Sequence, residues 1–296
     1  MWEPTSLSSN EYRTLNNMRR FLAAGIAAAV GWRAASALKS EESSRNQELP
    51  ASESSVQPRH VLCFLGRSRD QAQLLEAVAS AVRDFATGFS VDEAYSIPEP
   101  DARMARSFAV SRDRVVSNAW TPADEKSVAS HQSVLYVLGP RMNRQDTVKV
   151  SLTALRLVGR LIDAGAIAVK GESAGVAHGL DRWRELVRQG AEALKSGDSV
   201  AQHRVGRLAF AKRPLSARGY LESVGFHLVG LPEVYVPESL GSEMHVVALM
   251  DAVADEIAQR GLVAVLKERR GILTFASTYE DDDFKFNPFG IVRLAR

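Results

Sequence analysis

Blocks of apolar and polar positions alternate from residue 59 onward, and each block predicts an element of secondary structure. Short apolar runs predict strands over residues 61–65, 89–97, 133–138 and 166–170. Apolar residues at helical spacing predict helices over residues 70–85, 121–131, 146–164, 174–194 and 244–257. Further strands are predicted over residues 208–212 and 220–229. The pair 262–266 and 272–275 fits a hairpin.

Two of these helices carry sequence signals at their ends. Thr121 and Pro122, followed by Asp124, predict a helix start, because a hydroxyl caps the first turn and proline suits the first helical position. Gly165 follows the helix predicted over residues 146–164 and supplies its C-cap. The limits of both helices are therefore predicted by local chemistry.

The order of the elements indicates the fold class. Strands and helices alternate early in the chain, while strands cluster later. This order predicts an α+β fold, with a mixed β-sheet and helices packed mainly on one face, rather than a doubly wound α/β fold. We expect residues 59–296 to form a single α+β domain behind an N-terminal segment, residues 1–58.

The N-terminal segment contains a stretch that is typical of targeting signals. Residues 21–32 are Ala, Gly and larger apolar residues, a run too short for a membrane span, which needs about twenty. The run fits the h-region of a secretory signal peptide, with residues 35–37 as a cleavage site and Met18 as the start. Arg33 and the absence of acids between residues 12 and 40 instead resemble an organellar presequence.

A plain Ala-rich helix with no targeting function is the third interpretation of this stretch. Localisation is therefore unknown from the sequence, with export or envelope anchoring slightly favoured over an organelle or the cytoplasm. We expect any membrane association to use residues 21–32 only. Residues 40–58 are rich in Ser, Glu, Gln and Pro and predict a flexible linker.

Composition and charge exclude several classes of protein. The hydrophobic fraction of 45% and the charged fraction of 24% are those of a globular protein, not of a disordered chain. The formal net charge of +2 provides no general field for nucleic acid, so we expect no nucleic-acid partner, and other partners are unknown. Cys63 is the only cysteine, and its position in the apolar run 61–65 predicts a core residue. The histidines show no metal-ligand spacing, so neither a metal nor another cofactor is predicted.

Residues 171–175, Gly-Glu-Ser-Ala-Gly, match the G-x-S-x-G nucleophile elbow. A predicted strand precedes the motif and a predicted helix follows it, which is the context in which a sharp turn exposes a serine hydroxyl. In this interpretation Ser173 is the nucleophile, and His178 or His227 is the general base. The motif by itself resembles that of the α/β-hydrolases, and of carboxylesterases in particular.

The rest of the chain does not support that resemblance. Only about three predicted strands precede the motif, and no His-Gly-Gly oxyanion loop lies upstream. The downstream acid and histidine pairs are Asp198 with His203 or His227, and Glu233 with His245. In each pair the two residues are too close in sequence to lie on loops that follow successive strands of that fold. The simpler interpretation makes Ser173 the N-cap of the helix over residues 174–194 and His178 a surface or rim residue.

Three passages, residues 130–136, 170–183 and 224–236, together resemble an uncharacterised family of bacterial domains of unknown function. The likeness covers roughly the second half of the folded part, and it implies no reaction. It favours Ser173 as part of a structural turn. We therefore expect an uncharacterised α+β protein that serves as a non-enzymatic binding or interaction module. A serine hydrolase that uses Ser173 is the alternative, so whether the protein is an enzyme stays open.

Overall fold

The structure is a computed structural model that describes residues 57–117, 119–278 and 287–295. Contacts divide the chain into two units, Met1–Gln47 and Glu48–Arg296, and the described residues all belong to the second. The predicted targeting stretch, residues 21–32, lies outside the described residues. Within the described ranges, no helix has the length and apolar character needed to cross a membrane.

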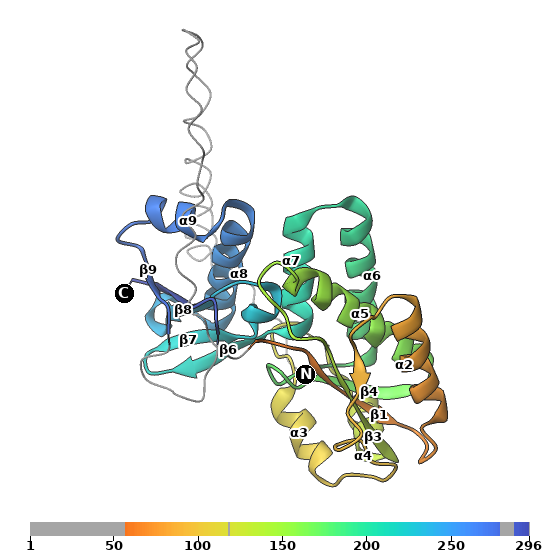
Figure 1. The fold of residues 1–296 in the computed structure, drawn as a ribbon. Helices are drawn as coiled ribbons and strands as arrows, with labels where there is room; N and C mark the ends of the chain where they lie inside the picture. Colours follow the sequence, from red (N-terminus) through yellow and green to blue (C-terminus); the bar gives the residue numbers. More distant parts are fainter. Residues whose placement is uncertain (1–56, 118, 279–286, 296) are drawn as a thin grey trace, which may run out of the picture. The chain divides into compact units, whose positions relative to one another are not determined.

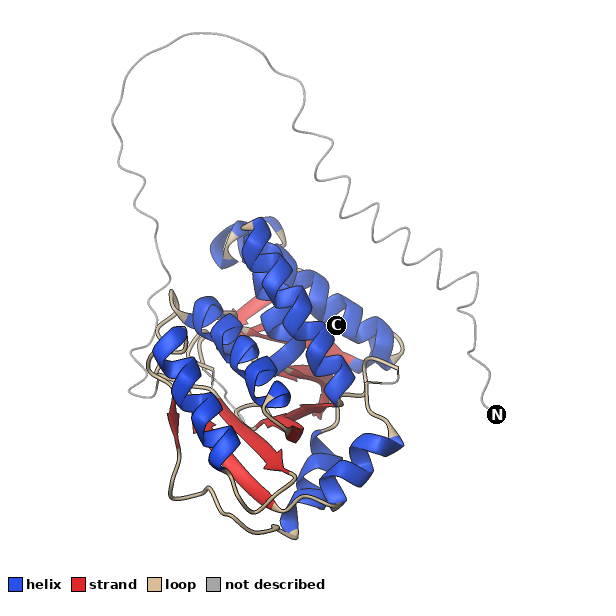
Figure 2. Cartoon of the chain, turned by 90° about the vertical axis from the view of Figure 1, so that its right-hand side faces the viewer, coloured by secondary structure: helices blue, strands red, loops and turns tan. Residues whose placement is uncertain are grey.

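The fold is α+β, as the order of elements predicted (Figure 1). The described residues form eight α-helices and two five-stranded sheets, so the strands are divided between two sheets rather than gathered in one. In the turned view of Figure 2, helices lie on both sides of the strands. Each sheet has a core of its own.

The first sheet is antiparallel throughout and has the strand order β2-β3-β1-β4-β5. Its strands are β1 (Val61–Gly66), β2 (Ser90–Val91), β3 (Ser133–Leu138), β4 (Ala166–Gly171) and β5 (Val176–His178). The predicted strands at residues 61–65, 133–138 and 166–170 are confirmed. They read as continuous apolar runs because helices cover both of their faces.

The helices on the first sheet are distributed unequally between its faces. The larger core contains Leu62 and Phe64 and packs against α2 (Ala72–Asp84), α5 (Thr147–Asp163), α6 (Leu180–Ser196) and α7 (Ser199–Phe210). On the other face, Cys63 and Leu65 pack against α3 (Arg103–Ser111) and α4 (Pro122–Ala129). Alternate residues of β1 therefore serve opposite cores, as the period of a strand requires.

The second sheet has the order β6-β7-β8-β10-β9, in which only β8 and β10 run parallel. Its strands are β6 (Lys212–Ala217), β7 (Tyr220–Val224), β8 (Glu233–Pro237), β9 (Leu273–Ala276) and β10 (Ile291–Leu294). The 3-10 helix η2 (Phe226–Val229) connects β7 to β8, and η3 (Glu238–Leu240) follows β8. Helices α8 (Glu243–Arg260) and α9 (Leu262–Glu268) pack on this sheet through Val246, Met250 and Val265.

Three of the strands predicted in the second half of the chain are wrong, and each has a physical reason. Residues 208–210 end α7, and β6 begins only at Lys212. The strand predicted over 220–229 stops at Val224, because Gly225 has a φ of 109° and turns the chain into η2. The predicted hairpin strand 262–266 is helix α9, whose Val265 is buried against α8. A short apolar run does not distinguish the periodicity of a helix from that of a strand.

Candidate functional site

The Gly-Glu-Ser-Ala-Gly motif forms the turn of a β-hairpin between β4 and β5. The amide of Gly175 donates to the carbonyl of Glu172 at 3.1 Å, and Gly175 has a φ of 64°. The hydroxyl of Ser173 donates to the carbonyl of Arg59 and accepts from the amide of Val61, both at 2.9 Å. Ser173 therefore ties this turn to the start of β1.

The helix predicted to begin at residue 174 begins instead at Leu180, so Ser173 is not its N-cap. Its N-cap is Gly179, which has no side chain to accept a hydrogen bond. The amide of Leu180 instead donates to a carboxylate oxygen of Asp124 at 3.0 Å. Asp124 also forms a capping box with Thr121, the residue that the sequence predicted as the N-cap of α4. One carboxylate thus stabilises two helix starts.

His178 is a buried strand residue and not the surface residue that was predicted. Its ring stacks edge-on against Trp183, with centroids 4.8 Å apart. Nε2 lies 3.2 Å from the carbonyl oxygen of Ala209, and Nδ1 lies 3.4 Å from a carboxylate oxygen of Asp113. Burial lowers the pKa of His178 to about 4, although the nearby Asp113 raises it. Both ring nitrogens therefore face groups inside the protein.

His227 lies in η2 and contacts a different carboxylate. Its Nδ1 is 3.3 Å from Oε1 of Glu233, and both side chains are buried. The hydroxyl of Ser223 donates to the other oxygen of Glu233 at 2.6 Å. An acid, a histidine and a serine therefore meet, but the serine bonds the acid rather than the histidine. The arrangement is not that of a catalytic triad.

The carboxylate of Glu233 is the centre of a buried hydrogen-bond network. Its Oε1 accepts from the amides of Gly225 and Phe226 at 2.9 and 3.0 Å. The side-chain amide of Asn287 donates to the same oxygen at 3.0 Å. The carboxylate thereby accepts from the backbone amides at the start of η2 and connects η2 to the segment that leads into β10.

A serine and a histidine that no motif indicated also form a close pair. Nε2 of His60 lies 2.8 Å from the hydroxyl of Ser151, which donates to the carbonyl of Leu228 at 2.5 Å. Both side chains are buried. Burial lowers the pKa of His60 to about 3, and the nearby His227 lowers it further. This pair connects the residue before β1 to α5 and η2 in the interior of the protein.

Cys63 is fully buried in β1, so the prediction of a core residue is confirmed. Burial raises the pKa of its thiol to about 12. Lys170 lies beside it on β4, and its Nζ is 2.7 Å from Oε1 of Glu172 and contacts the hydroxyl of Ser107. Glu172 follows β4 in the turn of the hairpin, and this turn places its carboxylate beside Lys170.

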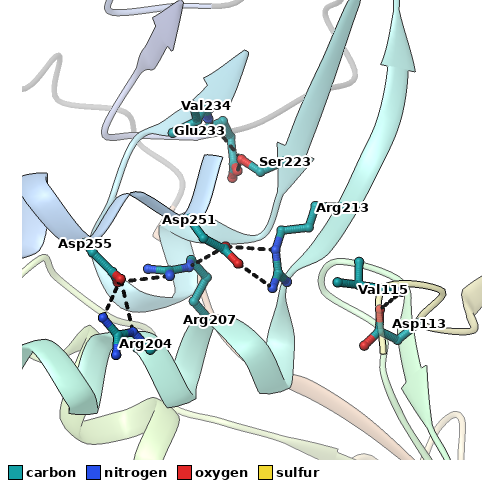
Figure 3. A network of polar contacts seen from close by, with 10 residues as sticks. All are labelled: Asp113, Val115, Arg204, Arg207, Arg213, Ser223, Glu233, Val234, Asp251 and Asp255. Carbon is teal, nitrogen blue, oxygen red and sulfur yellow. Dashed lines mark hydrogen bonds and ion pairs between the residues drawn. The ribbon is translucent and has the colours of Figure 1, made fainter. Parts of the chain in front are cut away.

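Three arginines and two aspartates form an ion-pair network between α7, β6 and α8. Figure 3 shows them pointing toward one another: Arg204, Arg207, Arg213, Asp251 and Asp255. Arg207 bonds both aspartates, at 3.2 Å to Asp251 and 3.0 Å to Asp255. The guanidinium of Arg207 is almost fully buried, whereas the Arg204 side chain is 53% exposed.

The two arginines of α7 form a matched pair for a stability test. Replacing Arg207 by alanine is expected to lower the free energy of unfolding by about 2–3 kcal/mol, because a buried, doubly paired cation and its packing are lost. Replacing Arg204 should cost less than about 1 kcal/mol, as is usual for an exposed pair. Urea denaturation of both variants checks this. Equal losses of unfolding free energy in the two variants would contradict the idea that burial strengthens the contribution of Arg207.

Asp198 and His203, another candidate pair of the sequence, have separate hydrogen-bond partners. Asp198 is the N-cap of α7 and accepts from the amides of Val200 and Ala201. Nδ1 of His203 lies 2.8 Å from the carbonyl of Ser199 in its own helix. Among the residues that the structure describes, no three His, Cys, Asp or Glu side chains gather in a way that could hold a metal ion.

A cavity of about 190 Å³ opens where α7, the loop between η2 and β8, and the junction of α8 with α9 meet. Its lining includes Arg144 and His203. No sequence pattern indicated this cavity, because its walls come from segments far apart in the chain.

Comparison with known proteins gives no match. No family model, no curated protein sequence and no solved structure is similar to this chain. The resemblance to an uncharacterised bacterial domain family therefore stays a prediction.

Proposed function

We propose that residues 59–296 act as a non-enzymatic binding module. The observation that carries this proposal is the double hydrogen bond of Ser173 to the backbone of Arg59 and Val61. A serine nucleophile needs its hydroxyl within reach of a base and of a substrate. The hydroxyl of Ser173 instead serves the fold.

The environments of the two candidate bases support the same proposal. The side chain of His178 is 0% exposed, and that of His227 is 8% exposed. Each faces a carboxylate and lies in the interior. The cavity beside α7 and α8, by contrast, is a concave surface lined by both apolar and polar residues.

Replacing Ser173 by alanine distinguishes the binding module from the serine hydrolase. We expect the free energy of unfolding to fall by about 1–2 kcal/mol, because the amide of Val61 loses its acceptor. We also expect a fluorophosphonate probe to label neither the wild type nor the variant. Urea denaturation and probe labelling followed by mass spectrometry measure the two effects.

The matched control is Ser216→Ala, at an exposed position of β6. This variant should change the stability by less than about 0.5 kcal/mol. Stoichiometric labelling of the wild type that disappears in Ser173→Ala but persists in Ser216→Ala would overturn the proposal and establish the hydrolase.

A further inference from the structure

The outer edges of the two sheets differ in how they are protected. An edge strand exposes backbone donors and acceptors, and proteins protect it by shortness, charge, proline, a bulge or a covering segment. β2 has only two residues, and β5 is covered by Asp113, whose amide donates to the carbonyl of Ala177 at 2.9 Å. β6 carries Lys212, Arg213 and Pro214, and its register with β7 shifts. These three edges are therefore protected against pairing with another chain.

The remaining edge strand, β9, carries no charge, no proline and no bulge. Residues 271–278, Gly-Ile-Leu-Thr-Phe-Ala-Ser-Thr, are all uncharged. The register of β9 with β10 is regular over Leu273–Ala276. Within the described ranges, β9 pairs with β10 and with no strand on its other side (Figure 1). Ile272, which precedes the strand, is 55% exposed. This edge is therefore open to another strand.

The register of β9 with β10 determines which backbone groups of β9 point outward. The amide of Ala295 donates to the carbonyl of Ile272, and the backbone groups of successive residues in a strand point in alternate directions. The groups of Thr274 therefore face β10, and those of Phe275 face away from it. In the part of the chain that the structure describes, the amide and the carbonyl of Phe275 have no partner.

The chemistry of this edge favours a second copy of the same chain as its partner. An uncharged strand offers no counter-charge to an acidic or basic peptide, and it meets no like charge in its own copy. A two-fold axis at Phe275 places the Phe275 residues of the two copies opposite each other. Each amide then donates to the carbonyl of the other copy. The same register places Thr274 opposite Ala276, so every side chain in the new strand pair is uncharged.

We propose that the chain forms a two-fold dimer in which β9 pairs antiparallel with β9 of a second copy. The pairing joins the second sheets of the two copies into one continuous sheet. Because β9 has four residues, the contact is small, and we expect a transient dimer whose fraction rises with concentration. This inference goes beyond the proposed binding module, since it names a surface and its partner and does not depend on Ser173.

Sedimentation velocity of the full-length chain over a range of micromolar concentrations tests the dimer. We expect a species of twice the monomer mass whose fraction grows with concentration. Thr274→Lys, at an exposed position of β9, should weaken dimerisation at least about tenfold, because each copy then brings a lysine to the same face of the strand pair. Ser216→Lys adds the same charge to an exposed position of β6 and should leave dimerisation unchanged.

Thermal melting establishes that each variant is folded. Thr274→Glu carries the opposite charge but also places like charges in the pair, so it should weaken the dimer similarly, and it replaces Thr274→Lys if that variant does not fold. A wild-type chain that stays monomeric throughout this range would overturn the proposal. A dimer that survives the charged variants of Thr274, or that is lost equally in Ser216→Lys, would overturn the assignment to β9.

Discussion

Replacing Glu233 by alanine is expected to lower the free energy of unfolding by about 3–5 kcal/mol. The side chain of Glu233 is buried, and its two oxygens accept from a hydroxyl, two backbone amides and a side-chain amide. Its removal leaves these donors without an acceptor in the interior, and each such donor costs about 1–3 kcal/mol. The variant therefore loses the hydrogen bonds at the start of η2 and the hydrogen bond to Asn287.

Urea denaturation followed by tryptophan fluorescence measures this loss. Glu238→Ala is the matched control, because Glu238 follows the same strand but is exposed, and it should cost less than about 0.5 kcal/mol. Glu233→Gln keeps one acceptor oxygen and should fall between the two, so the series remains informative if Glu233→Ala does not fold. Similar losses for Glu233→Ala and Glu238→Ala would contradict the structural role of the carboxylate.

Acidification is expected to remove about 4 kcal/mol of stability between pH 7 and pH 5 through two buried histidines. The folded-state pKa is about 3 for His60 and about 4 for His178, mainly because burial disfavours the charged ring. Both values lie below the ordinary value of about 6.5 in the unfolded chain. The unfolded state therefore takes up more protons as the pH falls below 6.5. Each histidine therefore loses about 2 kcal/mol of its stabilising contribution between pH 7 and pH 5, and the rest is lost as the pH falls through the folded-state pKa.

The variant His60→Gln tests how much of the stability lost on acidification comes from His60. The difference in unfolding free energy between pH 7 and pH 5 should shrink by about 2 kcal/mol, because glutamine does not titrate. Ser151→Ala is the matched control: it removes the same hydrogen bond but keeps the buried imidazole, so it should lower stability without reducing the pH dependence. An unchanged pH dependence in His60→Gln would rule out His60 as a source of acid sensitivity.

The sequence by itself determined the elements whose signals are local. Strands β1, β3 and β4 and helix α5 were predicted with small errors at their ends, and Thr121 was predicted as the N-cap of α4. Apolar periodicity and a cap three residues away act over a few positions, so they are visible in the chain itself. The α+β class follows from the order of these elements.

Only the tertiary structure decided what the candidate site contains. The hydrogen-bond partners of Ser173 lie 114 and 112 residues before it in the chain, the cap of α6 comes from a carboxylate 56 residues earlier, and Glu233 meets Asn287 across 54 residues. No local pattern records such a contact. The Gly-Glu-Ser-Ala-Gly motif therefore indicated a helix start, whereas folding made it a hairpin turn. A serine hydroxyl takes its role from the donors and acceptors around it, and the folded chain brings these together from distant positions.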